Sequence, residues 1–415
     1  MPRPENGQDA GKRKYCGRRP QLFPPEDEKA LKAVQHRELR IKTLTGYITV
    51  EAVYGQDRET GKWVMPMRER LGLQKHKPMT PALEDRLCHL AISTRSYEKA
   101  AEVANRQGIE TDDTQIKRVV QQAGQRAREQ AAQREAAALD PRKNREIARQ
   151  AGDGRKGSRF VMALMMDGTM LRIRGKDWGM KPVSTLGERA IWHELKAGLV
   201  IRLSEASAGR RQELAKYYVA TDGGPEELGR KLYAEALRRG LEQAERVYVI
   251  ADGAVWIWNV AAEHFPGSLE RLDFYHASEH VWDLSRVLWS DDKAAREWAV
   301  PLLSALKHRG GEELISALEA LRRTAEKEQW SDEKREALNR EASYFGKHAS
   351  RLDYPEAKAH GVPLGSGAME SACNQIQGRF KRSGQFWSRS GEQNLLTLEL
   401  AWRNWDWSSI WARSA

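Results

Sequence analysis

The sequence lacks several features that would assign it to a class at once. No window contains about 18 consecutive apolar residues, so we expect no transmembrane helix and no membrane partner. The first twenty residues are charged and hold no apolar segment, so we expect no secretory signal. The three cysteines, Cys16, Cys88 and Cys373, lie far apart without a CxxC pair, which argues against a disulfide framework or a zinc ribbon. A glycine-rich phosphate loop, a zinc-spaced histidine–cysteine set and an internal repeat are also missing from the sequence.

Apolar residues are nevertheless plentiful. Hydrophobic residues make up 40% of the 415 positions, and 14 of them are tryptophan. Such a chain can bury large cores and is not expected to be disordered. We therefore expect a cytoplasmic, globular protein with more than one domain.

Positive charge is concentrated in the N-terminal part. Lys and Arg outnumber Asp and Glu by 69 to 58, a formal charge of +11. Residues 1–160 hold 33 basic and 22 acidic side chains, whereas residues 161–415 hold 36 of each. A basic block in front of a neutral remainder favours nucleic acid as the partner.

The basic block is predicted to have three parts, of which the first two contain little helix. Residues 1–38 mix Lys, Arg, Pro and Gly without periodicity and are expected to form a basic arm. Residues 39–78 are expected to be a small β-rich region, because residues 39–44 and 47–54 alternate between apolar and polar side chains around Gly46.

The third part, residues 79–140, is predicted to be a helix-turn-helix domain whose last helix is extended. Helices are expected to begin near Pro81, Ser96 and Thr111, each with an apolar stripe at helical spacing. The opposite face of the third helix carries Gln115, Lys117, Arg118 and Gln121. A basic, glutamine-rich third helix after a turn is typical of DNA readers. An ordinary helical bundle with a solvated charged face has the same pattern.

From residue 155 the pattern becomes that of an α/β fold. Residues 160–166 are an apolar run that predicts a buried strand, and Asp167 with Gly168 predicts a turn into a second strand at residues 169–174. Further strands are expected at residues 197–203 and 247–251, followed by a short strand that ends at residues 272–274, and a helix is expected at residues 225–241. We therefore expect residues 155–276 to form the first part of an α/β core, residues 277–358 an all-helical insertion, and residues 359–415 the last part of the core.

Three acidic residues lie at positions where an α/β fold commonly carries functional groups. Asp167 and Asp252 each follow an apolar run and precede a glycine, and ligands in open α/β sheets bind at the carboxyl ends of strands. Glu370 lies in the first turn of a predicted helix at residues 367–382, in line with Asn374. Taken singly, an Asp-Gly pair is usually a turn and an early helical Glu is favoured by the helix dipole. Together the acids suit two Mg²⁺ or Mn²⁺ ions that catalyse phosphodiester displacement.

The blocks MALMMDGTM, VYVIADGAVWIW, LDFYHASEHV and GSGAMESACNQIQGRFKRSGQFWS occur in this order. They resemble the DDE transposases of bacterial insertion sequences, most closely the ISKra group, with kinship to Mutator-like elements. The resemblance covers roughly residues 80–402. It implies a ribonuclease H-like catalytic core in which Asp167, Asp252 and Glu370 are the catalytic, metal-binding triad.

The resemblance also identifies Asp273 and His276 as a D-x-x-H signature that supports the triad. Near Glu370, further residues are predicted to contact DNA: Asn374, Arg379, Lys381, Arg382 and Trp387. The basic side chains would contact phosphates, and Trp387 would either stack on an unpaired base or pack in the core.

The sequence thus predicts a DNA transposase that binds terminal inverted repeats and then cuts and joins double-stranded DNA. Because two transposon ends must be brought together, we expect a homodimer or a larger synaptic assembly. A stand-alone nuclease of the same fold and a DNA-binding protein with an inactive core remain as alternatives. A glycosidase also uses paired carboxylates, but it would leave the basic block without a role.

Overall fold

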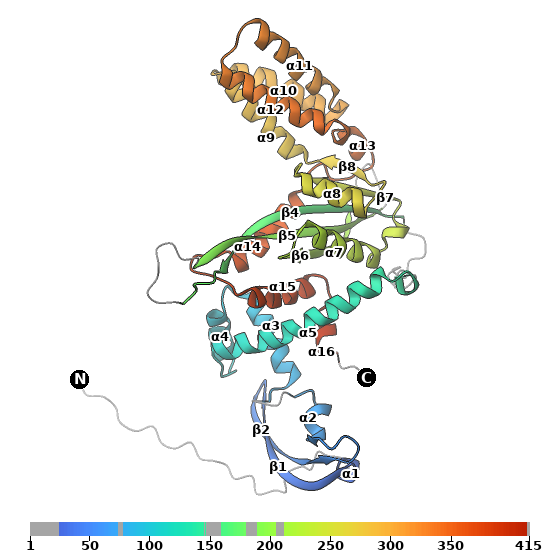
Figure 1. Cartoon of the computed structure of the whole chain (residues 1–415), viewed down its shortest axis with the longest axis vertical. Helices are drawn as coiled ribbons and strands as arrows, with labels where there is room; N and C mark the ends of the chain where they lie inside the picture. Colours follow the sequence, from blue (N-terminus) through green and yellow to red (C-terminus); the bar gives the residue numbers. More distant parts are fainter. Residues whose placement is uncertain are drawn as a thin grey trace, which may run out of the picture. The chain divides into compact units, whose positions relative to one another are not determined.

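The computed structural model describes residues 25–73, 78–144, 146, 159–179, 189–204 and 211–412. The chain forms two compact units. Unit 1 comprises Met1–Leu90, Tyr97–Ile116 and Arg413–Ala415, and unit 2 comprises Ala91–Ser96 and Lys117–Ala412. Both helices and strands are present, so the fold is mixed α/β (Figure 1).

Unit 1 contains a three-stranded antiparallel sheet of β1 (Leu31–Thr43), β2 (Gly46–Asp57) and β3 (Trp63–Val64), flanked by α1 (Pro25–Lys29) and α2 (Pro66–Arg70). The predicted hairpin is confirmed: Thr43 pairs with Gly46 across a turn in which Gly46 has a φ of 116°. The predicted arm at residues 1–38 is wrong at its end, because β1 already begins at Leu31. Residues 32–38 of β1 are exposed on both faces, so they show no alternation to reveal the strand. Residues 1–24 of the arm lie outside the described residues.

Three helices follow, close to their predicted positions: α3 (Pro81–Ser93), α4 (Tyr97–Arg106) and α5 (Asp113–Leu139). They do not form a separate unit at residues 79–140, because the division between the units runs through α3 and α5. In the first turn of α5, Gln115 accepts a hydrogen bond from the buried Lys42 of β1 (2.9 Å) within unit 1. Farther along, within unit 2, Gly124 lies so close to Asn394 that a Cβ there would be 2.5 Å from the Asn394 side chain.

Unit 2 is built on a five-stranded sheet in the order β6-β5-β4-β7-β8. The strands are β4 (Val161–Arg174), β5 (Ala190–Leu203), β6 (Glu213–Thr221), β7 (Arg246–Ala251) and β8 (Leu269–Leu272). β5 is antiparallel to both of its neighbours, β4 and β6, whereas β7 and β8 run parallel to β4. The predicted turn at Asp167 is wrong: β4 continues through Asp167 and Gly168, which pair with Ala197 and Lys196 of β5.

Helices cover both faces of this sheet. Met162, Leu164 and Met166 of β4 share one core with α7 (Pro225–Arg238) and α8 (Val255–His264). Because side chains alternate along a strand, Asp167 points to the other face, where α14 (Gly367–Phe380) packs on β4. A short 3₁₀ helix, η1 (Leu241–Gln243), connects α7 with β7.

The segment between β8 and α14 is helical throughout. It consists of α9 (Phe274–Leu288), α10 (Asp292–Arg309), α11 (Glu312–Lys327), α12 (Asp332–Lys347), η2 (Ala349–Arg351) and α13 (Tyr354–Ala359). Figure 1 shows α9 to α12, in yellow and orange, grouped beyond the β8 edge of the sheet. The chain closes with α15 (Arg389–Arg403) and α16 (Trp407–Trp411). Among the described residues, none of the helices combines the length and the apolar character that crossing a membrane requires.

Candidate active site

Asp167 and Asp252 lie at the same level of two adjacent parallel strands. The pairing of β4 with β7 ends at Met165 opposite Ile250. The two aspartates stand two residues farther along each chain, and they are close enough for the Asp252 carboxylate to raise the pKa of Asp167. Asp252 directly follows the last residue of β7, as predicted, and Asp167 lies within β4 where β7 has ended.

Local hydrogen bonds fix the backbone around Asp252. Its Oδ1 accepts a hydrogen bond from the N–H of Ala254 (3.0 Å), which turns the chain into α8. Gly253 between them has a φ of 102°, a conformation that favours glycine. The Tyr344 hydroxyl, from α12, donates to the carbonyl of Asp252 (3.0 Å). The turn that presents Asp252 is therefore held by both the sheet and the helical segment.

Cys373 joins Asp167 to the helix that carries Glu370. The thiol is buried on α14 and is hydrogen-bonded to the Asp167 carboxylate. Burial raises the pKa of Cys373 to about 12, and the Asp167 and Glu370 carboxylates contribute to this rise. Glu370 itself is exposed, three residues before Cys373. The structure thus brings all three predicted acids to one region, and sequence reasoning missed the thiol because it follows the apolar stripe of α14.

A fourth carboxylate, Glu194 of β5, lies near Asp167 but on the opposite face of the sheet, where it is paired with Lys196. Its Oε1 would be 2.1 Å from a Cβ placed on Gly168, so it lies directly over the residue after Asp167. Burial raises the pKa of Asp167, and hydrogen bonds from Gly168 and Cys373 lower it in part. The Asp252 and Glu194 carboxylates raise the pKa further. Such mutual repulsion between carboxylates favours a bound cation.

The donor chemistry of this cluster fits a hard divalent cation. Carboxylate oxygens are the ligands that Mg²⁺ and Mn²⁺ take in proteins. Asp167 and Asp252 supply two of them at one level of the sheet, and Glu370 is exposed one helical turn from Cys373. In the described part of the chain, no three His, Cys, Asp or Glu side chains are already grouped closely enough to hold a metal.

Asp273 joins the start of α9 to the start of α14. Its carboxylate is 2% exposed, and Oδ1 accepts hydrogen bonds from the N–H groups of Tyr275 (2.6 Å) and His276 (3.1 Å). Its Oδ2 accepts from both the N–H (2.6 Å) and the hydroxyl of Ser366. The half-buried His276 ring lies 3.5 Å from the Glu279 carboxylate and 5.0 Å, centre to centre, from the ring of His280. Asp273 is therefore placed to position the Glu370 helix rather than to contact a substrate.

Two residues predicted to contact DNA are buried inside unit 2. Arg379 is 5% exposed, and its Nε donates to the carbonyl of Ala91 (3.0 Å). Trp387 is 8% exposed, and its indole N–H donates to the carbonyl of Phe380 (2.8 Å). Burial therefore argues against phosphate contact by Arg379, and of the two roles predicted for Trp387 it favours packing over base stacking.

Two glutamines predicted to read DNA are also engaged internally. Gln115 bonds to Lys42, as described above, and the Gln121 Oε1 accepts from Asn394 (2.7 Å). The other predicted contacts are available at the surface. Lys117, Asn374 and Lys381 are exposed, and Arg118 and Arg382 are half-buried.

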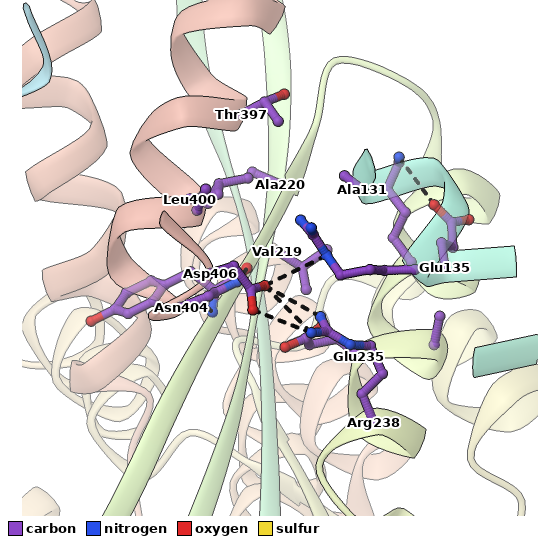
Figure 2. Close-up of a pocket in the computed structure, with 15 residues that line it drawn as sticks. Ala131, Glu135, Val219, Ala220, Glu235, Arg238, Thr397, Leu400, Asn404 and Asp406 are labelled. Atoms are coloured by element: carbon purple, nitrogen blue, oxygen red, sulfur yellow. Dashed lines mark hydrogen bonds and ion pairs between the residues drawn. The ribbon is translucent and has the colours of Figure 1, made fainter. Parts of the chain in front are cut away.

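A separate cluster of charges lies at the β6 edge of the sheet (Figure 2). It lines a cavity of about 130 Å³ between α5, α7, β6 and α15. Arg238 contacts Glu235 (2.6 Å) and Asp406 (3.3 Å), and Arg134 lies 3.8 Å from Asp406. Asn404 bonds to both backbone polar groups of Tyr218 on β6. Because these groups satisfy one another, the cluster stabilises packing and is not a second candidate site.

Comparison with known families and proteins adds little about function. The model of an uncharacterised protein family, UPF0236, matches residues 25–153. The matched part contains α1 to α5 but none of the strands of the five-stranded sheet. No curated protein matches the chain.

Proposed function

We propose that this protein is a DNA transposase that cuts and joins DNA at Asp167, Asp252 and Glu370. The observation that carries the proposal is the alignment of Asp167 with Asp252 on adjacent parallel strands, with Cys373 linking Asp167 to the Glu370 helix. The carboxyl ends of parallel strands are where α/β enzymes bind their ligands. A paired set of carboxylates there suits phosphodiester chemistry.

The topology of unit 2 supports a ribonuclease H-like core. Three antiparallel strands, β4 to β6, are followed by a helix and then by two strands parallel to β4. The helical segment from α9 to α13 occupies the place of an insertion between the second and third acids.

The protein's own contribution to catalysis is to place three carboxylates around the DNA phosphate. Asp167 and Asp252 would hold Mg²⁺ or Mn²⁺ from the sheet, and Glu370 would complete the site from α14. Two such ions would activate a water or a 3′-hydroxyl and would stabilise the leaving oxygen. Tyr344 and Asp273 keep the Asp252 turn and the α14 terminus in place.

The N-terminal part would bind the terminal inverted repeats. Three consecutive helices, α3 to α5, support a helix-turn-helix, and the exposed Lys117 with the half-buried Arg118 is suited to phosphate contact. The proposed partners are double-stranded DNA, as terminal repeats and as target, and further copies of this chain in a synaptic dimer or larger assembly. The expected location is the cytoplasm, where bacterial DNA is accessible.

The test is incubation with DNA carrying the flanking terminal repeats and Mg²⁺ or Mn²⁺, followed by mapping of the products. Asp252→Asn should abolish cleavage and leave end binding intact, because the amide keeps the shape and removes the charge that holds the metal. Asp283→Asn is the matched control, since Asp283 is a surface residue with a side chain 70% exposed on α9. Cleavage by Asp252→Asn would overturn the assignment.

The same products separate the alternatives. Joined 3′ ends indicate a transposase, and cuts without end specificity or joining indicate a nuclease. Binding without any cut indicates a DNA-binding protein with an inactive core.

A further inference from the structure

A short segment after α14 extends the sheet beside the end of β4. The Trp387 N–H donates to the carbonyl of Arg172 (3.0 Å), and the Arg174 N–H donates to the carbonyl of Trp387 (2.8 Å). Trp387 thus pairs with Ile173, and both side chains are buried. Because side chains alternate along extended backbone, Phe386 lies on the opposite face, together with Arg172 and Arg174.

That opposite face combines aromatic rings with positive charges. Trp192 of β5 pairs with Arg172 and is 57% exposed. The Arg172 guanidinium lies 5.6 Å from the Trp192 ring centre and 4.9 Å from that of Phe386. The Lys381 ammonium lies 5.7 Å from the Trp192 ring. We call this surface the aromatic–basic face; its members are Arg172, Arg174, Trp178, Trp192, Lys381 and Phe386.

Among the described residues, no acidic side chain compensates the cations of this face. Arg172 and Arg174 donate to the backbone carbonyls of Arg382 and Phe386, and a carbonyl does not neutralise a guanidinium. No carboxylate of the described ranges forms an ion pair with Arg172, Arg174 or Lys381. The nearby Glu194 is already paired with Lys196 (2.7 Å).

We infer that the aromatic–basic face binds single-stranded DNA, with Trp192 stacking on an unpaired base. An exposed indole offers its ring only to bases outside a duplex, and each stacked base contributes about 1–3 kcal/mol. Arg172 and Lys381, both close to the ring, match a polyanionic backbone. The inference rests on the proposed function, because DNA cutting and joining at the acids would supply unpaired strands. Arg172 lies five residues beyond Asp167 on β4, about 17 Å along the strand, and its side chain is on the opposite face of the sheet.

The test uses the full-length protein, a fluorescein-labelled 15-nucleotide oligo(dT) and fluorescence anisotropy in EDTA. Trp192→Ala should weaken binding at least fivefold, which corresponds to about 1 kcal/mol. Trp192→Phe keeps a ring and should stay within about twofold of the wild type. Trp405→Ala is the matched control, because Trp405 is also exposed (86%) in unit 2 but lies outside the aromatic–basic face.

A second variant keeps the test decisive. Lys381→Glu should also weaken binding and lower the slope of log affinity against log salt by about 0.7 or more. Unchanged affinity in Trp192→Ala, or an equal loss for a 15-base-pair duplex, would overturn the inference. Since EDTA removes the metal, the binding measurement does not depend on cleavage. If the protein binds oligo(dT) but cuts no DNA in Mg²⁺, the inference stands and the proposed function fails.

Discussion

Asp273 and Ser366 are joined by two hydrogen bonds although 93 positions separate them in the sequence. All the helices from α9 to α13 lie between these two residues, so the helical segment leaves and re-enters the sheet region at one point. Gly365 allows this approach, because a Cβ there would be 2.5 Å from the Tyr275 ring. The pair thereby fixes where α14 begins and, four residues later, where Glu370 projects.

The first prediction concerns the charge on Asp273. Asn has one side-chain oxygen where Asp has two. In Asp273→Asn this oxygen can accept hydrogen bonds either from the α9 N–H groups or from Ser366, but not from both. The free energy of unfolding should fall by about 3 kcal/mol, since hydrogen bonds to a charged group contribute about 1.5–3 kcal/mol each. Ser366→Ala removes only the hydroxyl bond and should cost about 1.5 kcal/mol. Urea titration of both variants measures these losses.

The control for this prediction is another helix-capping aspartate. Within the described residues, the Asp291 side chain accepts a single hydrogen bond, from the N–H of Ala294 (2.9 Å) at the start of α10. Asp291→Ala should cost about 1 kcal/mol and leave DNA cleavage unchanged. If Asp273→Asn cost no more stability than Asp291→Ala, the link between α9 and α14 would not be the role of Asp273.

The second prediction concerns the contact of the helical segment with the Asp252 turn. Tyr344→Phe keeps the stacking on His280 (4.1 Å between ring centres) and removes the hydrogen bond to the Asp252 carbonyl. Stability should fall by about 1 kcal/mol, and the cleavage rate should drop about fivefold while end binding stays constant. Tyr354→Phe is the control: the buried Tyr354 hydroxyl finds no hydrogen-bond partner among the described residues, so its removal should leave stability unchanged or higher. Equal effects of the two variants would contradict the prediction.

The helices and the short buried strands could be predicted from local pattern. Apolar spacing located α3 to α5 and α7, and an unbroken apolar run located β7. The sequence predicts a turn in the middle of β4, because an Asp-Gly pair has the same local chemistry in a turn and in a strand. The pairing of Gly168 with Lys196 of β5 decides between them, and that contact is not local. β6 is not predicted, because its first two residues are exposed and only its last three are buried, so it shows no apolar run.

The acids of the candidate site could be predicted from the sequence, but the residues that contact them could not. Asp167 and Asp252 could be identified because both follow apolar runs, but their alignment depends on the parallel pairing of β4 with β7. The contacts of Cys373 with Asp167 and of Tyr344 with Asp252 connect residues of different elements, so no spacing rule reveals them. Burial likewise could not be read from residue type, which is why Arg379 resembled a DNA contact.

The third prediction concerns DNA binding by α5. Lys117→Ala combined with Arg118→Ala should weaken binding to terminal-repeat DNA and lower the salt slope by about 1.8, since each phosphate contact contributes about 0.9. Lys293→Ala is the control, because Lys293 is an exposed lysine of α10 in the helical segment. Filter binding between low and moderate salt gives the slopes. A slope that does not change in the double variant would exclude this face of α5 as the DNA contact.

The fourth prediction concerns Glu392, a buried carboxyl group of α15 whose two oxygens accept no hydrogen bond from the described residues. Burial raises its pKa from 4.5 to about 8; Asp222 adds to the rise, and Arg389 and Arg128 oppose it. Because the folded pKa exceeds the unfolded one, the stabilising contribution is complete below pH 4.5 and is lost as the pH rises through 8. Glu392→Gln should therefore gain stability relative to wild type between pH 5.5 and 8.5, on the order of 3 kcal/mol in urea titrations. The exposed Glu263→Gln should show no such gain, and a pH-independent difference for Glu392→Gln would mean that Glu392 is ionised in the folded protein.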